Sequence, residues 1–286
     1  MRKRLEILFV LMLFSATAML AQMTTSGING MVTAGGDKAI GATVTAVHEP
    51  SGTTYNTVVN ESGRYSINGM RVGGPYTVKV SYIGYTTSVT KDVTLQLAES
   101  YSLNVKLAED ANELGEVVVS AKATKFTAER TGASTNINLR QLENMPTVSR
   151  SITDFTRLSP YGGNGMSFAG TDGRTANFTV DGANFNNNFG LSDGLPGGGN
   201  PISIDAIEEM QVVISPYDVR QTNFIGGGVN AITKSGTNTF KGTAYIYHQN
   251  ENMRGDAIER EQISGAREKD QKTTYGFTLG GPIIKN

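Results

Sequence analysis

The sequence contains no cysteine and no tryptophan, and its only histidines are His48 and His248. Without cysteine, the chain forms no disulfide, no thiolate metal site and no cysteine nucleophile. Its 25 basic and 26 acidic side chains give a net charge of −1. Nucleic-acid binding requires a surplus of Lys and Arg on one face, so we expect no nucleic-acid partner. After the N-terminal segment, no apolar run is long enough to resemble a transmembrane helix.

The N-terminal segment "MRKRLEILFVLMLFSATAMLAQ" has the three regions of a secretory signal peptide. It starts with basic residues, continues with an apolar run over 7–14, and ends in small residues. A membrane anchor is the alternative, but this run is well short of the roughly 20 apolar residues that span a bilayer. We therefore predict a signal peptide over residues 1–21, cleaved after Ala21 or Ala18, and export of the mature protein.

The composition indicates a mainly β protein. There are 34 Gly against 8 Pro, and the many Thr, Val, Ser, Asn and Tyr residues favour turns and pleated strands over helices. In "YTVKVSY", Tyr76, Val78 and Val80 alternate with polar residues, so one face of this strand is expected to be buried. The first domain, over residues 22–108, has about seven strand-like runs at the spacing of a β-sandwich: "GINGMVT", "GATVTAVHE", "TYNTVVNE", "GRYSING", "YTVKVSYIGY", "TTSVTKDVTLQL" and "SYSLNVKL".

The first domain resembles the carboxypeptidase regulatory-like domain, a seven-stranded sandwich found on many exported Bacteroidetes proteins. The likeness is carried by "GMVTAGGDKAIGATVTA", "NESGRYSINGM" and "YTVKVSYIGY". The name invites the prediction of a zinc peptidase, but such a site needs clustered His and carboxylate ligands. Neither histidine has an HxxE or HExxH context. The resemblance therefore implies an accessory module without catalysis.

A linker over residues 109–122 contains the strand-like segment "EVVVSA", whose polar flanks cannot bury a sheet around it. One interpretation is the first strand of the following domain. The other is a peptide held ready for β-augmentation, in which its backbone pairs with the sheet edge of another protein. The stretch "ELGEVVVSA" resembles the TonB box region of TonB-dependent outer-membrane receptors. This implies that TonB binds Glu116, Val117, Val118, Val119, Ser120 and Ala121.

The third segment, residues 123–238, combines short helices and strands. "NLRQLENMP" and "SRSITDFTRLSP" predict helices, and the second has Ser149 or Ser151 as its N-cap. One face of this second helix is expected to hold Ile152, Phe155 and Leu158. In "ANFTVDGANF", the dipeptide Asp181-Gly182 between two strand-like arms predicts a hairpin.

"PISIDAIEEMQVVIS" predicts a short helix capped by Ser203 that runs into a strand. We expect its solvated side to carry Asp205, Glu208 and Glu209. "GGGVNAITKSGTN" predicts a further strand and a turn. This order of elements resembles the plug domain of TonB-dependent receptors, with specific likeness in "INLRQLENMP", "NFTVDGANFNN", "IDAIEEMQVV" and "GGGVNAITKSGTNTFKGTAY". In that family the last stretch joins the plug to its barrel.

Residues 239–286 predict the first strands of a transmembrane β-barrel. In "YGFTLGG", Tyr275, Phe277 and Leu279 alternate with Gly and Thr, the pattern of a strand that faces lipid on one side. "TFKGTAYIYHQN" is similar, and the charged stretch 251–272 suits an outer loop. The layout resembles Oar-like receptors of Bacteroidetes, and SusC-like receptors share it. Such barrels have about 22 strands, so we expect this chain to be a fragment or a truncated open reading frame.

These features predict a mainly β chain with an N-terminal seven-stranded β-sandwich, a small α/β plug domain and the first strands of an incomplete transmembrane β-barrel. No enzyme motif is complete. "GVNAITKS" has Thr233 where the phosphate-binding loop needs Gly, and "GMSFA" has Ala169 where the nucleophile elbow needs Gly. Turn chemistry explains Asp172, Asp181 and Asp193 better than calcium binding does. We expect no catalysis, no cofactor and no metal.

The resemblance implies a receptor of the cell outer membrane that admits a large ligand under TonB control, with the sandwich and plug on the periplasmic side or inside the barrel. Its implied partners are TonB, outer-membrane lipid, an extracellular glycan, siderophore, peptide or protein, and a surface lipoprotein. The Asn- and Gly-rich stretch 184–200 is either a flexible connection or a ligand contact. The contact candidates are Asn184, Phe185, Asn186, Asn187, Asn188 and Phe189. A second hypothesis is a secreted, non-transporting β-rich interaction or adhesion protein.

Overall fold

The computed structural model describes residues 24–109, 117–120, 133–145, 147, 150–186, 195, 200–215, 221, 224–253, 255, 257–258, 261–262 and 268–284. The predicted signal peptide lies outside these residues. The chain divides into two compact units, Met1–Ser235 and Gly236–Asn286. In the described part, no helix combines the length and the apolar character needed to cross a membrane. Strands dominate the fold, as the composition predicts.

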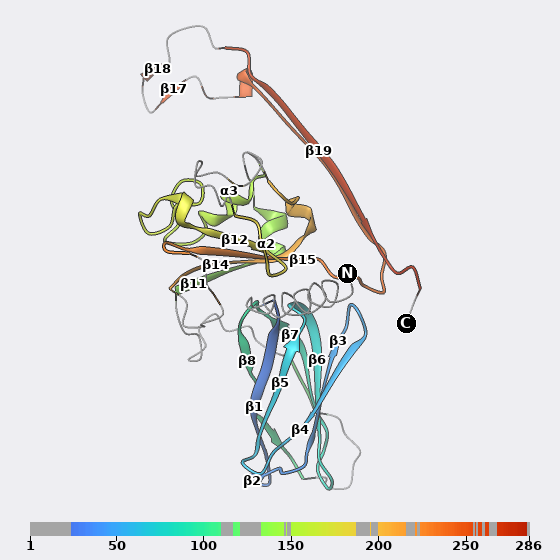
Figure 1. Ribbon diagram of the computed structural model, residues 1–286. Helices are drawn as coiled ribbons and strands as arrows, with labels where there is room; N and C mark the ends of the chain where they lie inside the picture. The colour runs from blue at the N-terminus through green and yellow to red at the C-terminus, as the bar shows by residue number, and fades with distance from the viewer. Residues whose placement is uncertain are drawn as a thin grey trace, which may run out of the picture. The chain divides into compact units, whose positions relative to one another are not determined.

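The first part of the chain folds into a sandwich of two sheets (Figure 1). Its strands are β1 (Ser26–Ala34), β2 (Asp37–Lys38), β3 (Thr43–His48), β4 (Thr53–Val58), β5 (Arg64–Met70), β6 (Gly73–Ser81), β7 (Ser88–Leu95), β8 (Ser100–Ser102), β9 (Val105–Leu107) and β10 (Val117–Ser120). One sheet has the order β2-β1-β5, with β8 and β9 both parallel to β1, and the other has the order β10-β7-β6-β3-β4. The seven expected runs are all strands; the last divides into β8 and β9, and β2 is an addition.

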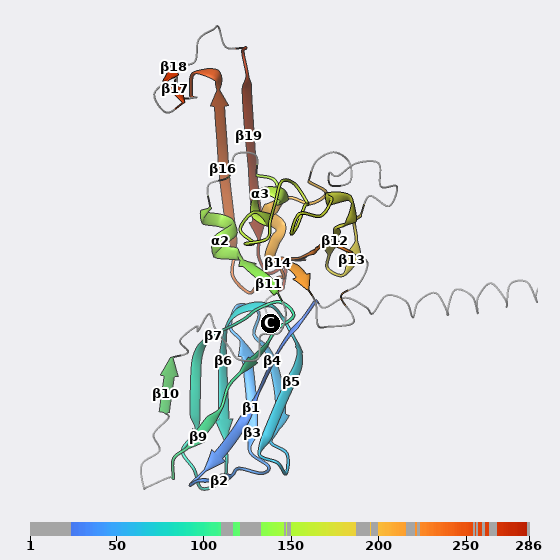
Figure 2. The same cartoon turned by 90° about the vertical axis from the view of Figure 1, so that its left-hand side faces the viewer.

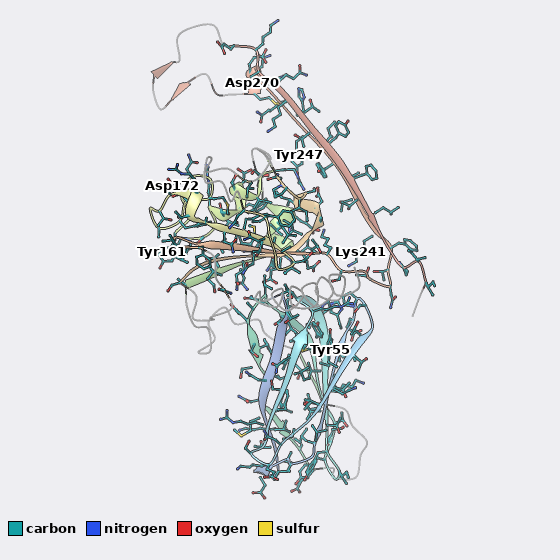
Figure 3. All side chains as sticks on the ribbon, viewed as in Figure 1. Tyr55, Tyr161, Asp172, Lys241, Tyr247 and Asp270 are labelled. Carbon is teal, nitrogen blue, oxygen red and sulfur yellow. The ribbon has the colours of Figure 1, made fainter. Side chains whose placement is uncertain are left out.

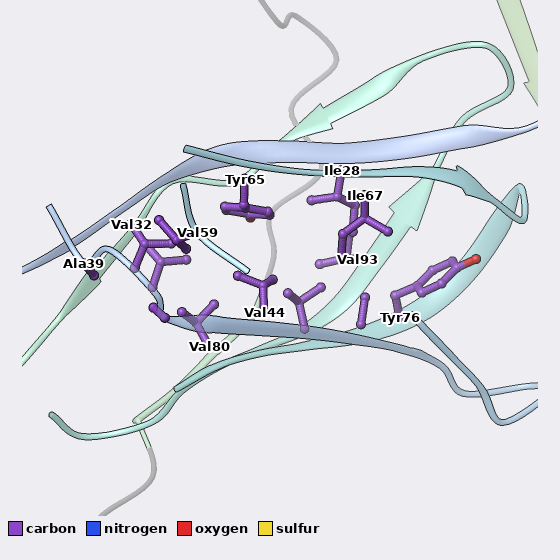
Figure 4. Close-up of a cluster of buried hydrophobic side chains, with 14 of the residues drawn as sticks. Ile28, Val32, Ala39, Val44, Val59, Tyr65, Ile67, Tyr76, Val80 and Val93 are labelled. Atoms are coloured by element: carbon purple, nitrogen blue, oxygen red, sulfur yellow. The ribbon is translucent and has the colours of Figure 1, made fainter. Parts of the chain in front are cut away.

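Alternation along β6 directs one of its faces into the sandwich core. Tyr76, Val78 and Val80 are buried, whereas Lys79 between them is exposed. In Figure 4, Val80 and Tyr76 of this sheet lie opposite Val32 and Ile28 of the facing sheet. A fully buried aliphatic or aromatic side chain contributes about 1.5–3 kcal/mol, so this shared core is the main source of stability for the sandwich.

The second part of the same unit is a small α/β fold with its own sheet; it occupies the predicted plug segment and is called the plug below. Its elements are β11 (Ala133–Asn138), α2 (Leu139–Asn144), α3 (Ile152–Thr156), η2 (Gly173–Thr175), β12 (Asn177–Val180), β13 (Ala183–Asn184), η4 (Ile204–Ala206), β14 (Ile207–Ser215) and β15 (Gly228–Thr233). The sheet order is β11-β14-β15-β12-β13. Its buried apolar side chains form a cluster separate from that of the sandwich, so the two domains have independent cores.

Both predicted plug helices are present, and each begins with a capping box. Ser151, one of the two expected caps, is the N-cap of α3. Ile152 and Phe155 are buried as expected. Leu158 is 39% exposed, because α3 ends before this residue and its side chain leaves the helical face.

The dipeptide Asp181-Gly182 forms the predicted hairpin between β12 and β13. Both residues have positive φ, 48° and 81°, as a type I′ turn requires. The Asp181 carboxylate also accepts hydrogen bonds from the N–H of Thr233 at 2.9 Å and from its hydroxyl at 2.7 Å. Asp181 therefore stabilises the turn and its connection to β15, in agreement with the interpretation of this acid as a turn residue.

The helix expected after Ser203 is wrong. Ser203 caps only the short 3-10 turn η4, and the chain then extends into β14. β14 lies between β11 and β15, and its valines and isoleucines suit a strand that is covered on both faces. Consequently Glu209, expected on a solvated helix face, is only 3% exposed. Asp205 forms an ion pair with Arg150 at 2.6 Å.

The second unit contains a long antiparallel hairpin. Its elements are β16 (Lys241–Asn250), η5 (Glu251–Met253), β17 (Ala257–Ile258), β18 (Glu261–Gln262) and β19 (Gln271–Gly280). β16 and β19 pair over their whole lengths, from Lys241 opposite Gly280 to Asn250 opposite Gln271. Among the described residues no third strand pairs with this hairpin, so the predicted barrel strands are present without a closed barrel.

Candidate functional site

Strand β10 contains four of the six candidate TonB-binding residues. The sequence suggests that no sheet is ready to accept this segment, and that expectation is wrong. β10 pairs in parallel with β7, with Val117 opposite Ser88 and Ser120 opposite Lys91. It is the terminal strand of the second sandwich sheet, as Figure 2 shows, and not the first strand of the plug sheet.

The open edge of β7 explains this placement. The unpaired N–H and C=O groups at a sheet edge pair readily with an extended segment that reaches them. The linker starts beside this edge, because the N–H of Thr86 donates to the carbonyl of Ala108 at 2.9 Å. The polar residues that flank β10 in the sequence gave no sign of this pairing, because β7 is adjacent to β10 only in the folded chain. The other two candidates, Glu116 and Ala121, lie outside the described residues.

A hydrogen-bonded network, here called the Leu97 junction, connects the sandwich to the plug. The Leu97 N–H donates to Glu209 Oε1 at 2.9 Å, and the Leu97 carbonyl accepts from Gln211 Nε2 at 3.0 Å. Asn136 Nδ2 donates to Glu209 Oε1 at 3.1 Å, and Asn136 Oδ1 accepts from Gln211 Nε2 at 3.0 Å. Three polar side chains from β11 and β14 thus hold the backbone of the residue that closely follows β7.

Burial raises the pKa of Glu209 to about 8. The hydrogen bonds from Leu97 and Asn136 act in the opposite direction, and the nearby acids Glu99 and Glu208 raise the pKa further. The carboxyl group is therefore mostly protonated at neutral pH. This role of Glu209 is not visible when the segment is interpreted as a helix; the valine-rich run after the glutamates is the signal for a buried strand.

The candidate ligand loop begins beside β12, and its first asparagines support local structure. Asn184 Oδ1 accepts from the N–H of Asn186 at 2.9 Å, and Asn186 Oδ1 accepts from the N–H of Phe178 at 2.6 Å. The Phe185 ring lies 6.5 Å from that of Phe178 and is 39% exposed, so part of it faces solvent. Three further candidates lie outside the described residues: Asn187, Asn188 and Phe189.

The two faces of the β16–β19 hairpin differ in polarity. On one face Ile246 is the register partner of Tyr275, and Phe277 follows on the same side. These three side chains are 74%, 80% and 83% exposed, and side chains project from the hairpin along its length in Figure 3. On the other face the hydroxyls of Thr243 and Thr278 are 2.6 Å apart. One apolar and one polar face is the pattern of a barrel strand pair between lipid and lumen.

Asp172, one of the acids considered for calcium, is also explained by local structure. Its carboxylate caps η2 by accepting from the Arg174 N–H at 3.0 Å and pairs with the Arg174 guanidinium. These hydrogen bonds lower the pKa of Asp172 to about 2. Within the described ranges, no group of three or more His, Asp or Glu residues is arranged to hold a metal ion. Asp193 lies outside those ranges.

Comparison with known proteins matches both ends of the chain. Residues 27–108 match the carboxypeptidase regulatory-like domain, and residues 232–286 match an outer membrane beta barrel domain. A curated protein, the TonB-dependent transporter Oar of Myxococcus xanthus, is 26% identical over 247 residues.

The chain is similar to a TonB-dependent outer-membrane receptor.

The alignment with Oar covers 80% of this chain and 22% of the relative, so the chain spans under a quarter of the length of the transporter it matches. The similarity is to an Oar-like receptor, and the barrel-domain match over residues 232–286 indicates the cell outer membrane.

Solved structures give weaker matches to this chain. The siderophore receptor PirA from Acinetobacter baumannii matches with a TM-score of 0.39 and 22% identity, over 54% of this chain and 23% of PirA. Catechol 1,2 dioxygenase from Acinetobacter radioresistens matches with a TM-score of 0.27 and 15% identity, over 36% of this chain and 60% of the enzyme. Both scores are too low for either structure to support an argument about fold or function.

Proposed function

We propose that this chain supplies the sandwich, the plug and the first barrel strands of a TonB-coupled receptor that takes up a large ligand without catalysis. The sandwich and plug are on the periplasmic side or inside the barrel. The ligand is an extracellular glycan, siderophore, peptide or protein, brought to the barrel mouth with a surface lipoprotein. The observation that carries the proposal is a short strand, β10, that forms the terminal edge of a sheet and precedes the plug in the chain.

Energy coupling requires a contact that withstands pulling. A strand that pairs with TonB loads several backbone hydrogen bonds together, each with a net contribution of about 0.5–1.5 kcal/mol. TonB draws on the proton gradient of the inner membrane. A pull on β10 therefore acts on the plug that follows it in the chain and opens a path through the barrel.

The apolar face of the β16–β19 hairpin supports the membrane part of the proposal. A row of large apolar side chains at this exposure is unfavourable in water, whereas lipid accepts it. The second hypothesis, a secreted adhesion protein, requires this face to be covered within a soluble sheet. The barrel-domain match of residues 232–286 favours the membrane.

The substitution Val118→Pro in the full-length receptor tests the proposal. Proline removes a backbone donor and disrupts strand pairing, so we expect TonB binding and uptake to be lost. Binding is measured by titrating the purified receptor with the TonB C-terminal domain. Uptake is measured as growth on a medium that requires the receptor gene.

The matched control is Val118→Thr, which keeps a β-branched side chain and every backbone hydrogen bond. We expect this variant to bind TonB and to support growth. Normal TonB binding by Val118→Pro would refute the assignment of β10 as the coupling strand.

A further inference from the structure

The sandwich domain has no assigned task in the uptake mechanism, although its sheet holds the candidate coupling strand. We propose that the sandwich presents β10 to TonB, and that TonB adds a strand of its own to the outer edge of β10. The resulting sheet would run from β4 through β3, β6, β7 and β10 into TonB. This inference deepens the proposed function and depends on it.

The chain is guided towards β7 from the start of the linker. Tyr85 and Glu109 form an antiparallel bridge, next to the hydrogen bond between the Thr86 N–H and the Ala108 carbonyl. β7 begins two residues after Thr86, at Ser88. Only residues 110–116 separate this fixed point from β10. A short tether gives a high effective concentration of the strand at its edge, which favours the paired state.

The geometry of β7 sets the length of the presented strand. Its edge pairs with β10 from Ser88 to Lys91. The next residue, Asp92, has a φ of 61°, outside the β region, and the register between β6 and β7 is irregular nearby. The edge is therefore regular over the same residues that β10 covers. β10 ends at Ser120, opposite Lys91, where its template ends.

The outer edge of β10 is where a further strand would pair. Successive residues of a strand direct their backbone N–H and C=O groups to alternate sides. β7 occupies one side, and in the described part of the chain no strand pairs with the other. A TonB strand needs only one side of its partner. Pairing with β7 therefore removes no hydrogen bond that TonB would form, and it orders the segment before TonB arrives. The sandwich is therefore expected to present β10 to TonB and not to compete with TonB for it.

A disulfide lock tests the proposal in the 286-residue chain, which has no cysteine of its own. Lys91→Cys and Ser120→Cys place two thiols at register partners, and Lys91 is exposed. Register partners are close enough for a disulfide. Diamide oxidises the two thiols to the disulfide and is itself reduced to the hydrazine. The control pair, Lys91→Cys with Val119→Cys, is shifted by one residue from the register, since Val119 is opposite Thr90.

We expect the register pair to form the disulfide at least tenfold faster than the control pair. We also expect the locked chain to bind the TonB C-terminal domain at least as tightly as the reduced chain, in a titration monitored by calorimetry. Equal oxidation rates for the two pairs would overturn the pairing with β7. Tenfold weaker binding by the locked chain would overturn presentation, because it would mean that TonB must first remove β10 from the sandwich.

The same titration separates this inference from the proposed function. If the register pair cross-links rapidly but neither the locked nor the reduced chain binds TonB, the assignment of TonB as partner fails. Presentation then fails with it, whereas the sandwich pairing of β10 stands. If the reduced chain binds TonB and only the locked chain does not, TonB coupling is supported and presentation alone is rejected.

Discussion

At the residue scale, Glu209 departs most from its predicted environment: the sequence places it on a solvated helix face, whereas its side chain is buried. Its carboxyl group is buried in the Leu97 junction, next to the acids Glu99 and Glu208. A buried carboxyl group is stable when it is neutral and costly when it is charged. The contribution of Glu209 to stability therefore depends on pH.

We predict that Glu209→Gln removes a pH dependence of the unfolding free energy. The pKa of Glu209 is about 8 in the folded chain, against an ordinary value of 4.5. Its stabilising contribution is therefore complete below pH 4.5 and is lost as pH rises to about 8, because the unfolded chain ionises first. Glutamine keeps an oxygen acceptor and never ionises. At pH 8 we expect the variant to be more stable than the wild type by up to about 5 kcal/mol, since the pKa is raised from 4.5 to about 8 and each unit corresponds to about 1.4 kcal/mol.

Chemical denaturation at several pH values measures this effect. The control is Glu208→Gln, a change at the neighbouring position of β14, whose side chain is half-buried. We expect this control to retain most of the pH dependence of the wild type, because burial, and only to a small extent the Glu208 charge, raises the pKa of Glu209. A Glu209→Gln variant that loses stability in parallel with the wild type between pH 4.5 and 8 would contradict the prediction.

At the element scale, the local signals of the plug were correct wherever a few consecutive residues decide the structure. The capping boxes of α2 and α3 and the type I′ turn at Asp181-Gly182 are examples. β14 differs, because its secondary structure depends on two neighbouring strands, β11 and β15, that are far away in the sequence. β14 pairs with β11 along one edge and with β15 along the other, so the segment is a strand where a capped helix was predicted.

For the β16–β19 hairpin, we predict that Phe277→Lys lowers assembly of the full-length receptor in the outer membrane. Phe277 lies on the apolar face, and a lysine on the lipid face of a barrel strand costs about 2–4 kcal/mol near the bilayer centre. The measurement is the amount of heat-modifiable receptor in the outer-membrane fraction.

Thr278→Lys is the matched control, because Thr278 lies on the polar face and a lumen position tolerates charge. We expect near-normal assembly of this control. Equal losses in both variants would contradict the assignment of the two faces to lipid and lumen.

At the scale of the whole molecule, the sandwich and the plug have separate apolar cores that are joined by a polar contact. The Leu97 junction connects the segment after β7 to β14, the strand between β11 and β15. Hydrogen bonds in a buried site couple two domains strongly only while each donor and acceptor has its partner. The integrity of this network therefore controls whether the two cores unfold together.

We predict that Gln211→Ala weakens this coupling. The change removes the donor to the Leu97 carbonyl at 3.0 Å and to Asn136 Oδ1 at 3.0 Å. The Leu97 carbonyl keeps its hydrogen bond from Asn136 Nδ2 at 3.2 Å, whereas Asn136 Oδ1 loses its donor. Leaving such an acceptor without its donor costs about 1–3 kcal/mol. Differential scanning calorimetry should then resolve two transitions, or broaden a single one.

Gln96→Ala is the control, since Gln96 is exposed and adjacent to Leu97 in the chain. Its thermogram should match that of the wild type. An unchanged thermogram for Gln211→Ala would show that the junction contributes little to the union of the two domains.

The sequence by itself determined the features that neighbouring residues control: the alternation of β6, the helix caps, the hairpin turn and the two-faced pattern of β19. Each depends on interactions within a few residues, so a linear pattern contains the necessary information. Only the tertiary structure decided that β10 pairs with β7 and that Glu209 is buried against Leu97. Both outcomes depend on which sheet edge is open and which strands lie on either side, and such contacts join residues that the sequence separates.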